Sequence, residues 1–399
     1  MSVNYDQIIS PVVKNLPPSG IRRFFDLVAN TKGVISLGVG EPDFVTPWHI
    51  REACVYSLEK GYTMYTSNYG LPELRKEIAS YLLKNYEVEY NPDNEIIVTI
   101  GASEAVDIAL RTLVSPGDEV LIPEPCYVSY SPCTVLAGGK PVTIKTNAAN
   151  GFKLTPQQLE ASITAKSKVL VLCYPNNPTG AIMTKEDLQA IAKVIEKHNL
   201  IVISDEIYSE LTYQGKHTSI ASLPGMKDRT ILVNGFSKAF AMTGWRIGYV
   251  CAPKELIAAM VKIHQYTIMC ASIMAQKAAI EALQNGRPQV NHMVSQYNYR
   301  RRLIVSRLNE IGLSCFEPKG AFYVFPSIKI TGMSSDEFAE KLLAEEKVAV
   351  VPGNAFGTSG EGHIRISYAS SLQQINEALN RIDNFVKRHA QLSAVNSNC

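Results

Sequence analysis

Short apolar runs alternate with amphipathic segments through the middle of the chain, and this alternation limits the fold more than any other feature. Apolar runs of strand length occupy residues 95–100, 119–123, 168–173, 200–204 and 230–233. Hydrophobicity is continuous along each run, so we expect strands that are buried on both faces. Strands that alternate with helices predict a mostly parallel central sheet between two layers of helices, an α/β three-layer sandwich.

Helical periodicity predicts helices over residues 71–86 and 184–198, and a third helix that begins near Ser103. Thr184 is followed three residues later by Asp187, which is close to a capping box. In both segments the apolar residues recur at helical spacing and share one face: Leu74, Ile78 and Leu82 in the first, and Leu188, Ile191, Ala192 and Ile195 in the second.

After about residue 285 the pattern changes to a smaller α+β unit. It predicts helices over 296–311 and near 335–344, and strands over 321–325, 348–351 and 364–368. We therefore divide the chain into an N-terminal arm with part of the small domain (1–48), a large domain (49–285), a C-terminal small domain (286–391) and a disordered polar tail (392–399).

Composition excludes several classes of protein. With 399 residues, 46% hydrophobic and 19% charged, the chain can bury a large core. A net charge of +2 without a Lys/Arg-rich run argues against nucleic-acid binding. No window approaches the ~18 apolar residues of a membrane span, and the first ten residues lack a secretory signal. Eight dispersed cysteines and seven dispersed histidines predict a reduced cytoplasmic protein without a metal site.

Lys238 is the first candidate for chemistry. It follows a strand within NGFSKAFAMTGWRIGYV (234–250), among small and apolar residues. Such neighbours partly desolvate an amine, which lowers its pKa and suits it to imine formation. Gly235 and Gly244 let the backbone approach a ligand, and Arg246 can bind a phosphate. A lysine that merely extends from a loop into solvent fits the same composition.

Asp205 follows the apolar run at 200–204, and ligands of open α/β sheets gather at the carboxyl ends of strands. A carboxylate there needs a partner. A pyridine nitrogen is a fitting one, because the carboxylate keeps it protonated and makes the ring a better electron sink. Tyr208 could reach a phenolic oxygen of such a ring. The alternative interpretation is the N-cap region of a helix.

Two turns add candidate contacts. In IGASEA (100–105) small residues precede a helix, whose free amides suit a phosphate, although neither a P-loop nor a dinucleotide fingerprint is present. In YPNNPTG (174–180), Asn177 precedes a proline, is biased toward extended backbone and could donate to a ligand oxygen. An ordinary connecting turn fits this second segment equally well.

Arg365 lies inside the otherwise apolar strand pattern EGHIRISYA (361–369). A buried guanidinium needs an anionic partner, and a carboxylate bound through two parallel hydrogen bonds is the best geometric match. A structural ion pair within the protein is the competing explanation.

Taken together, these motifs resemble a known family. SLGVGEPDF, YTSNYGLPELR, GASEA, PCYVSY, YPNNPTG, SDEIY, FSKAFAMTGWRIGY, PKGAFYVFP and HIRISYA follow one another as in the class I/II aminotransferases of the fold type I pyridoxal-phosphate enzymes. The resemblance extends from about Gly20 to Lys387. It is greatest to aromatic-amino-acid aminotransferases and to relatives that act on acetylated diaminopimelate. It implies an aspartate aminotransferase-like fold and pyridoxal 5'-phosphate as the cofactor.

The resemblance also assigns roles to single residues. Lys238 would form the Schiff base and move the proton, Asp205 would face the ring nitrogen, and Tyr208 and Asn177 would contact the phenolic oxygen. The remaining roles are ring stacking by Tyr127, phosphate binding by Ala102, Ser103 and Arg246, contact with the neighbouring subunit's phosphate by Tyr65, and binding of the substrate α-carboxylate by Arg365 with the backbone of Gly40 and with Asn177. The role of Tyr65 implies a homodimer with shared sites.

Two positions depart from the family pattern. Many relatives carry a phosphate-binding serine where this chain has Gly235, so Ser237 or backbone amides would compensate. Aspartate-preferring relatives of a similar subgroup carry a lysine where this chain has Ser103, which argues against an enzyme dedicated to dicarboxylates.

The resemblance therefore implies transfer of an amino group from an aromatic or bulky hydrophobic L-amino acid to 2-oxoglutarate by a ping-pong mechanism. The alternatives are an aminotransferase for aspartate or N-acetyl-LL-diaminopimelate, and a C–S β-lyase on the same fold. A cofactor-binding regulator would need an added helix-turn-helix, for which we expect no room. Four aromatic residues could line the substrate pocket or belong to the core: Tyr62, Tyr69, Phe322 and Tyr323.

Overall fold

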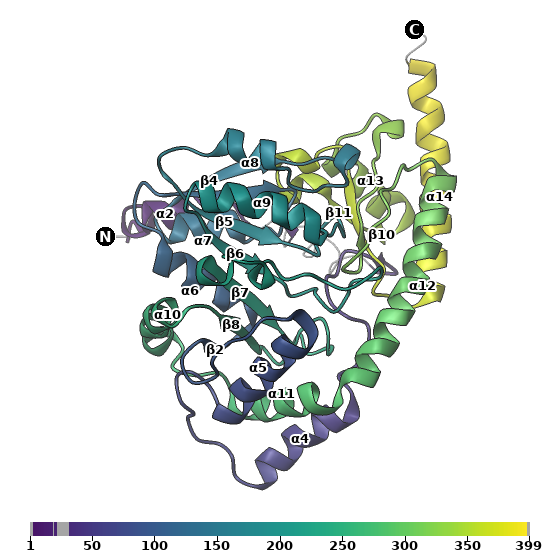
Figure 1. The fold of residues 1–399 in the computed structure, drawn as a ribbon. Coiled ribbons are helices and arrows are strands. Elements are labelled where there is room, and N and C mark those ends of the chain that lie inside the picture. Colours follow the sequence, from purple (N-terminus) through teal and green to yellow (C-terminus); the bar gives the residue numbers. More distant parts are fainter. Residues whose placement is uncertain (1–2, 19, 22–31, 397–399) are drawn as a thin grey trace.

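The computed structural model describes residues 3–18, 20–21 and 32–396, and these residues form a central sheet of seven strands (Figure 1). The five strands at one side run parallel, and one strand near the other edge is antiparallel to both of its neighbours. The predicted mostly parallel sheet is thus confirmed. In spatial order the strands are β2 (Ile96–Thr99), β8 (Gly248–Cys251), β7 (Thr230–Gly235), β6 (Ile201–Asp205), β5 (Ser167–Cys173), β3 (Glu119–Glu124) and β4 (Lys140–Lys145).

Helices cover both faces of the sheet, as the continuous apolar runs predicted. On β5, Val169 and Val171 pack into one apolar cluster, and Leu170 and Leu172 pack into another on the opposite face. The first cluster contains residues of α6 (Gly101–Leu113), α7 (Tyr130–Leu136) and α10 (Lys254–Thr267). The opposite face is covered by α8 (Pro156–Ser162) and α9 (Lys185–Lys197), and near β2 and β8 by α5 (Pro72–Tyr86) and α11 (Ile273–Asn285).

Helix boundaries agree with the prediction where a local signal exists. Thr184 caps α9, and its hydroxyl and the Asp187 carboxylate accept hydrogen bonds from each other's backbone N–H, which is a complete capping box. Helix α6 begins at Gly101, two residues before the expected start at Ser103. The predicted helix at 296–311 is wrong in its start, because α12 (Arg287–Ile311) begins with a proline in its first turn.

The C-terminal part forms a smaller α+β domain. Its apolar core joins α12, α13 (Ser335–Glu346) and α14 (Leu372–Asn396) to an antiparallel sheet of β11 (Val351–Pro352), β12 (Ile364–Ser367) and β9 (Tyr323–Val324). Helices α12 and α14 lie side by side (Figure 1). Because α14 continues to Asn396, residues 392–396 are helical rather than a disordered tail; residues 397–399 lie outside the described residues.

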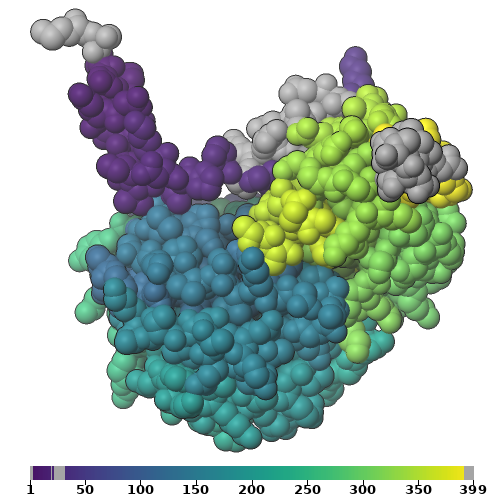
Figure 2. All heavy atoms as spheres, turned by 90° about the horizontal axis from the view of Figure 1, so that it is seen from above, coloured from purple at the N-terminus to yellow at the C-terminus, as the bar shows by residue number. Residues whose placement is uncertain are grey.

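The N-terminal segment contacts the small domain and also extends away from the body. Strand β1 (Ile35–Ser36) pairs in parallel with β10 (Val348–Ala349). Before it, α1 (Tyr5–Ile8) and α2 (Pro11–Lys14) project outward with exposed apolar side chains (Figure 2). The other elements are α4 (Trp48–Glu59) and the short 3-10 helices η1 (Ala148–Asn150), η2 (Ile220–Ser222), η3 (Lys227–Arg229), η4 (Lys329–Thr331), η5 (Gly353–Phe356) and η6 (Thr358–Gly360).

The described residues contain neither a candidate membrane-spanning helix nor a cluster of metal-ligating side chains. Among these residues no helix combines the length and apolar character that would be required to cross a lipid bilayer. Within the same part of the chain, no group of three or more His, Cys, Asp or Glu side chains is arranged to hold a metal ion.

Candidate active site

The carboxyl ends of β3, β5, β6 and β7 meet at one edge of the sheet, where a cavity of about 470 Å³ opens toward the small domain. Segments that are far apart in the sequence line it, from Gly40 after β1 to Arg365 on β12. This is the place where open α/β sheets bind ligands. Most of the residues predicted for the site line this cavity: Gly40, Ala102, Ser103, Tyr127, Asn177, Asp205, Tyr208, Ser237, Lys238, Arg246 and Arg365.

Lys238 lies in the turn after β7 and points its amine into the cavity. Its Nζ donates a hydrogen bond to the carbonyl oxygen of Gly40 at 2.6 Å. Burial, with a smaller contribution from the nearby Arg365 guanidinium, lowers the pKa of Lys238 to about 8. About one-tenth of the amine is therefore uncharged at pH 7, far more than for an ordinary lysine, which suits a nucleophile or a general base. The interpretation as a lysine extended into solvent does not hold.

Asp205 is the last residue of β6 and is almost fully buried. Burial raises its pKa to about 6, although the hydroxyl of Tyr130 donates to its Oδ2 at 2.8 Å and stabilises the charged form. Its Oδ1 accepts the backbone N–H of Ile207 at 3.2 Å. No helix follows β6, since residues 207–210 form turns, so the alternative of a helix N-cap is excluded. A carboxylate held in this way can face a cationic nitrogen.

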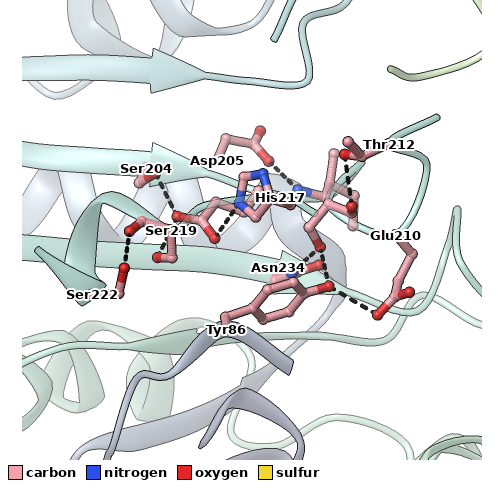
Figure 3. A network of polar contacts seen from close by, with 12 residues as sticks. Tyr86, Ser204, Asp205, Glu210, Thr212, His217, Ser219, Ser222 and Asn234 are labelled. Carbon is pink, nitrogen blue, oxygen red and sulfur yellow. Dashed lines mark hydrogen bonds and ion pairs between the residues drawn. The ribbon is translucent and has the colours of Figure 1, made fainter. Parts of the chain in front are cut away.

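A second buried carboxylate, that of Glu206, follows Asp205, and its partners Ser204, His217 and Ser219 gather around the end of β6 (Figure 3). Glu206 accepts hydrogen bonds from the hydroxyls of Ser204 and Ser219 at 2.9 and 2.8 Å. Its other oxygen lies 2.9 Å from Nε2 of His217. These contacts join the loop that follows β6 to the strand itself. The backbone that carries Asp205 is therefore held on both sides.

The first turn of α6 forms a cradle for an anion. Gly101 has φ +72°, and a Cβ atom there would lie 2.8 Å from the Arg246 guanidinium, so a side chain would disturb both residues. Arg246 donates to the carbonyl oxygen of Thr243 at 3.0 Å, and among the described residues it has no carboxylate partner. Free helical amides together with an unpaired guanidinium favour a phosphate at this end of the cavity.

Gly235, where the sequence departs from the expected family pattern, leaves little room for a side chain. Gly235 pairs with Gly248 across β7 and β8, and a Cβ atom at Gly235 would lie 3.0 Å from the Cα of Gly248. A serine would crowd the two strands. Ser237, two residues on, lines the cavity instead.

Arg365 lies on β12 and is almost fully buried. Its guanidinium donates to Oδ1 of Asn177 at 2.9 Å and to the carbonyl oxygen of Gly38 at 2.6 Å. Among the described residues no carboxylate pairs with it, and its Nε has no partner, so the alternative of an internal ion pair is not supported. A Cβ atom at Gly40 would lie 2.6 Å from the hydroxyl of Tyr323. Because its two acceptors, an amide oxygen and a carbonyl oxygen, are neutral, the positive charge of Arg365 stays available to a ligand carboxylate.

Aromatic side chains complete the wall of the cavity. The hydroxyls of Tyr208 and Tyr323 lie 2.8 Å apart, and Tyr127 packs edge-to-face on Tyr130. Of the four aromatic residues proposed for the substrate pocket, Tyr323 alone lines it, while Phe322 belongs to the core of the small domain. Tyr62 and Tyr69 do not line the cavity, which corrects that part of the prediction.

Tyr65 is the one predicted site residue that this chain does not bring to the cavity. Its side chain is 82% exposed, as expected for a residue that would serve another subunit. Several further cavity residues were missed by sequence reasoning, among them Val39, Glu41, Tyr130 and Cys173. Tyr130 ends the motif PCYVSY, three residues after Tyr127, and this position could have indicated a place in the cavity. Val39, Glu41 and Cys173 have no such local signal.

The charged and polar groups in the cavity together suit one kind of ligand. The buried carboxylate of Asp205 can pair with a protonable nitrogen, the partly neutral amine of Lys238 lines the same cavity, and the first turn of α6 with Arg246 suits a phosphate. The guanidinium of Arg365 also lines the cavity and contacts only neutral acceptors, which suits a second, carboxylate-bearing molecule. The residues therefore fit a flat, phosphorylated ring that carries a basic nitrogen and an aldehyde.

Comparison with known proteins gives matches over nearly the whole chain. The sequence model of the family described as "Aminotransferase class I and II" matches residues 32–382. The protein YugH of Bacillus subtilis (strain 168) is 58% identical, covering 95% of this chain and 98% of its own length. The aspartate aminotransferase of Pyrococcus abyssi is 50% identical over 93% of this chain and 96% of its own. The solved aromatic aminotransferase of Pyrococcus horikoshii OT3 is 47% identical with a TM-score of 0.88, covering 92% of this chain and 99% of that one.

Proposed function

Because this chain belongs to the aminotransferase class I and II family, it is a pyridoxal 5'-phosphate-dependent transaminase, and we propose that it transfers the amino group of an aromatic or bulky hydrophobic L-amino acid to 2-oxoglutarate. Family membership confirms the predicted enzyme class, fold and cofactor. One observation carries the proposal for the site: Lys238, Asp205 and Arg365 line a single cavity, although they come from three separate parts of the chain.

The bound cofactor supplies an aldehyde that accepts amines and a ring that delocalises negative charge. In our proposal Asp205, ionised above a pH of about 6, holds the proton on the ring nitrogen. Tyr208 and Asn177 donate to the ring oxygen, and Tyr127 stacks on the ring. Ala102, Ser103, Ser237 and Arg246 bind the phosphate.

Arg365 binds the substrate α-carboxylate, assisted by Gly40 and Asn177, and thereby orients the α-carbon. Lys238 would hold the cofactor's aldehyde carbon and, when its amine is free, would take the proton from that α-carbon. Because burial brings the pKa of Lys238 down to about 8, the amine can both accept this proton and release it near neutral pH. The same residues act in reverse on a 2-oxo acid, which gives ping-pong kinetics.

The preference for a hydrophobic substrate rests on the charges in the cavity. Three cationic side chains, Lys238, Arg246 and Arg365, are found among the described residues of its lining, and each already has a proposed role. No further cation remains in this chain for the distal carboxylate of aspartate. Val39, Tyr127 and Tyr323 instead offer apolar surface to a larger side chain.

One specific observation favours aspartate as a second candidate. The Pyrococcus abyssi relative, which is named an aspartate aminotransferase, shares 50% of its residues over 93% of this chain. A residue of a second subunit would then have to provide the missing cation.

We also propose that the protein is a homodimer with shared sites. This chain leaves large apolar side chains exposed at Met64, next to Tyr65 in sequence, and at Trp48 at the start of α4. Further ones lie on α1 and α2, which project from the body (Figure 2). Extended apolar surface of this kind marks a protein interface. A second copy would bring its Tyr65 to the phosphate of this chain's cofactor.

A donor and acceptor screen tests the function. The protein with its cofactor is incubated with 2-oxoglutarate and phenylalanine, tyrosine, leucine, aspartate, N-acetyl-LL-diaminopimelate or cystathionine, and glutamate is measured. We expect the aromatic amino acids to be the best donors, with parallel lines in double-reciprocal plots. Release of pyruvate and ammonia from cystathionine without an acceptor would instead identify a β-lyase.

Substitution of the lysine tests the site. Lys238→Ala should lose donor-stimulated turnover and the covalent attachment of the cofactor. Lys341→Ala, which removes a half-exposed lysine of α13, should behave as the unmodified protein. Normal turnover in Lys238→Ala would refute the assignment.

A further inference from the structure

Glu104 folds its side chain away from the cavity, although it directly follows the cradle residue Ser103. Its Oε2 accepts the backbone N–H of Ile100, the residue before α6, at 2.5 Å. Its Oε1 lies 2.5 Å from Nδ1 of His264 on α10. Ser103 lines the cavity, whereas Glu104 does not. The carboxylate thus joins the turn between β2 and α6 to a helix that packs behind it.

His264 is an unusual residue for this place. Its side chain has no exposed surface and that of Glu104 is 10% exposed, and around them α6 and α10 meet through apolar residues. Among the described residues Nε2 of His264 has no partner. A buried carboxylate and imidazole cost free energy that an apolar pair would avoid. Such a pair is therefore weak evidence for a role in stability. It is stronger evidence that the two residues hold the neighbouring backbone in one position.

The backbone next to this pair has little freedom. A Cβ atom on Gly248 would lie 2.8 Å from the amide nitrogen of Ala102, and one on Gly101 would lie 2.8 Å from the Arg246 guanidinium. Strand β8 and Arg246 therefore bound the turn on two sides. Glu104, held by His264, fixes it from a third side. The first N–H groups of a helix have no partner within the helix. Glu104 accepts the N–H of Ile100, the residue before α6, and so ties the backbone down at this point.

We propose that Glu104 and His264 are positioning residues that hold the first turn of α6 in register with Arg246, and that they set the affinity for the cofactor's phosphate without touching it. The pair also keeps a negative charge turned away from the phosphate, which it would otherwise repel. This inference rests on the proposed function, because it takes Ala102, Ser103 and Arg246 as the phosphate cradle.

The test compares two ligands that differ only in the phosphate. The protein without cofactor is titrated with pyridoxal 5'-phosphate and, separately, with pyridoxal, and dissociation constants are obtained from absorbance and fluorescence. Glu104→Ala should weaken binding of pyridoxal phosphate by up to about tenfold, because binding would then have to order a helix turn that has lost a stabilising contact of the strength of a cap. Binding of pyridoxal should change less than about twofold.

Two further substitutions separate geometry from charge. Glu104→Gln keeps an acceptor for the Ile100 N–H and can donate to a neutral imidazole, so it should restore most of the affinity. A purely electrostatic role predicts the opposite, namely tighter phosphate binding in Glu104→Gln than in the unmodified protein. His264→Phe fills the same space without the hydrogen bond and should reproduce the loss seen in Glu104→Ala, which keeps the test decisive if Glu104→Ala does not fold.

His198 offers a control away from the cavity, since its Nε2 lies 2.8 Å from Glu160 of α8 at the end of α9, in a more exposed His–Glu pair. His198→Phe should leave both dissociation constants unchanged. The inference would be overturned if a variant lost equal affinity for pyridoxal and for its phosphate. It would also be overturned if neither Glu104→Ala nor His264→Phe lost affinity for the phosphate form. If the unmodified protein itself showed no preference for the phosphorylated ligand, the cradle would be wrong and the proposed site would fall with it.

Discussion

Tyr130→Phe is the most informative perturbation of the proposed site, because it removes a single oxygen atom next to Asp205. Burial raises the pKa of Tyr130 well above its ordinary value, so its hydroxyl stays neutral and donates to Asp205 at 2.8 Å. Without that hydroxyl, Asp205 keeps the longer bond from the Ile207 N–H. Burial then acts on the carboxylate with less compensation.

The size of the effect follows from this geometry. A hydrogen bond to a charged group contributes about 1.5–3 kcal/mol, and one pKa unit corresponds to about 1.4 kcal/mol. Since the pKa of Asp205 is already raised to about 6, loss of the bond should raise it by about one further unit. At pH 7 the ionised fraction would fall from about nine-tenths to about one-half.

The sign of the pH dependence is therefore fixed. A higher pKa means that Asp205 becomes protonated at a higher pH, so the charged form that holds the ring nitrogen is lost earlier as the pH falls. Cofactor affinity should fall as the pH is lowered, and in Tyr130→Phe this fall, the acid limb of the pH profile, should occur about one pH unit higher. The dissociation constant of pyridoxal phosphate, measured from pH 5 to 9, reports this shift.

Tyr174→Phe is the control, because Tyr174 is also buried and hydrogen-bonded through its hydroxyl, to the carbonyl oxygen of Phe152, yet does not line the cavity. Its acid limb should coincide with that of the unmodified protein. An acid limb in Tyr130→Phe that stays in place or moves to lower pH would refute the reasoning about Asp205.

Two further predictions concern the cradle and the second subunit. Gly101→Ala should weaken cofactor binding about tenfold in equilibrium titration. A left-handed backbone costs an L-residue about 1–2 kcal/mol, and the new Cβ would lie 2.8 Å from the Arg246 guanidinium. Unchanged affinity would contradict the proposed phosphate cradle. Sedimentation should give twice the mass of one chain, and Tyr65→Phe should weaken cofactor binding several-fold without changing that mass; a monomer would remove the shared site.

The sequence predicted those parts of the fold that have a local signal. The apolar runs of β5 and β6 and the capping box at Thr184 appear as expected. Strand β4 was not predicted, because at this edge of the sheet its residues are mostly polar or half-exposed. The start of α12 was missed because its buried side chains, among them Val290 and Met293, are spread thinly along a charged helix.

For the site, strand ends and motifs were sufficient to predict the residues that would touch ligands. Lys238, Asp205 and Arg365 each follow or interrupt an apolar strand, which is a pattern visible along the chain. Tyr323 lines the cavity while its neighbour Phe322 is buried in the core, and no local feature separates the two. The difference depends on which side of β9 faces the large domain.

The residues that support the site escaped prediction for a physical reason: their partners are distant in sequence and obey no period. Tyr130 meets Asp205 across 75 positions, and Glu104 meets His264 across 160. In each case a carboxylate binds a side chain from another element, and the two meet only when the helices have packed on the sheet. Arg365 shows the complementary case. It is held by a neutral amide and a carbonyl oxygen rather than by a carboxylate. Its charge therefore stays uncompensated until an anionic substrate binds. The free energy of burying this unpaired guanidinium is offset only when a ligand carboxylate pairs with it.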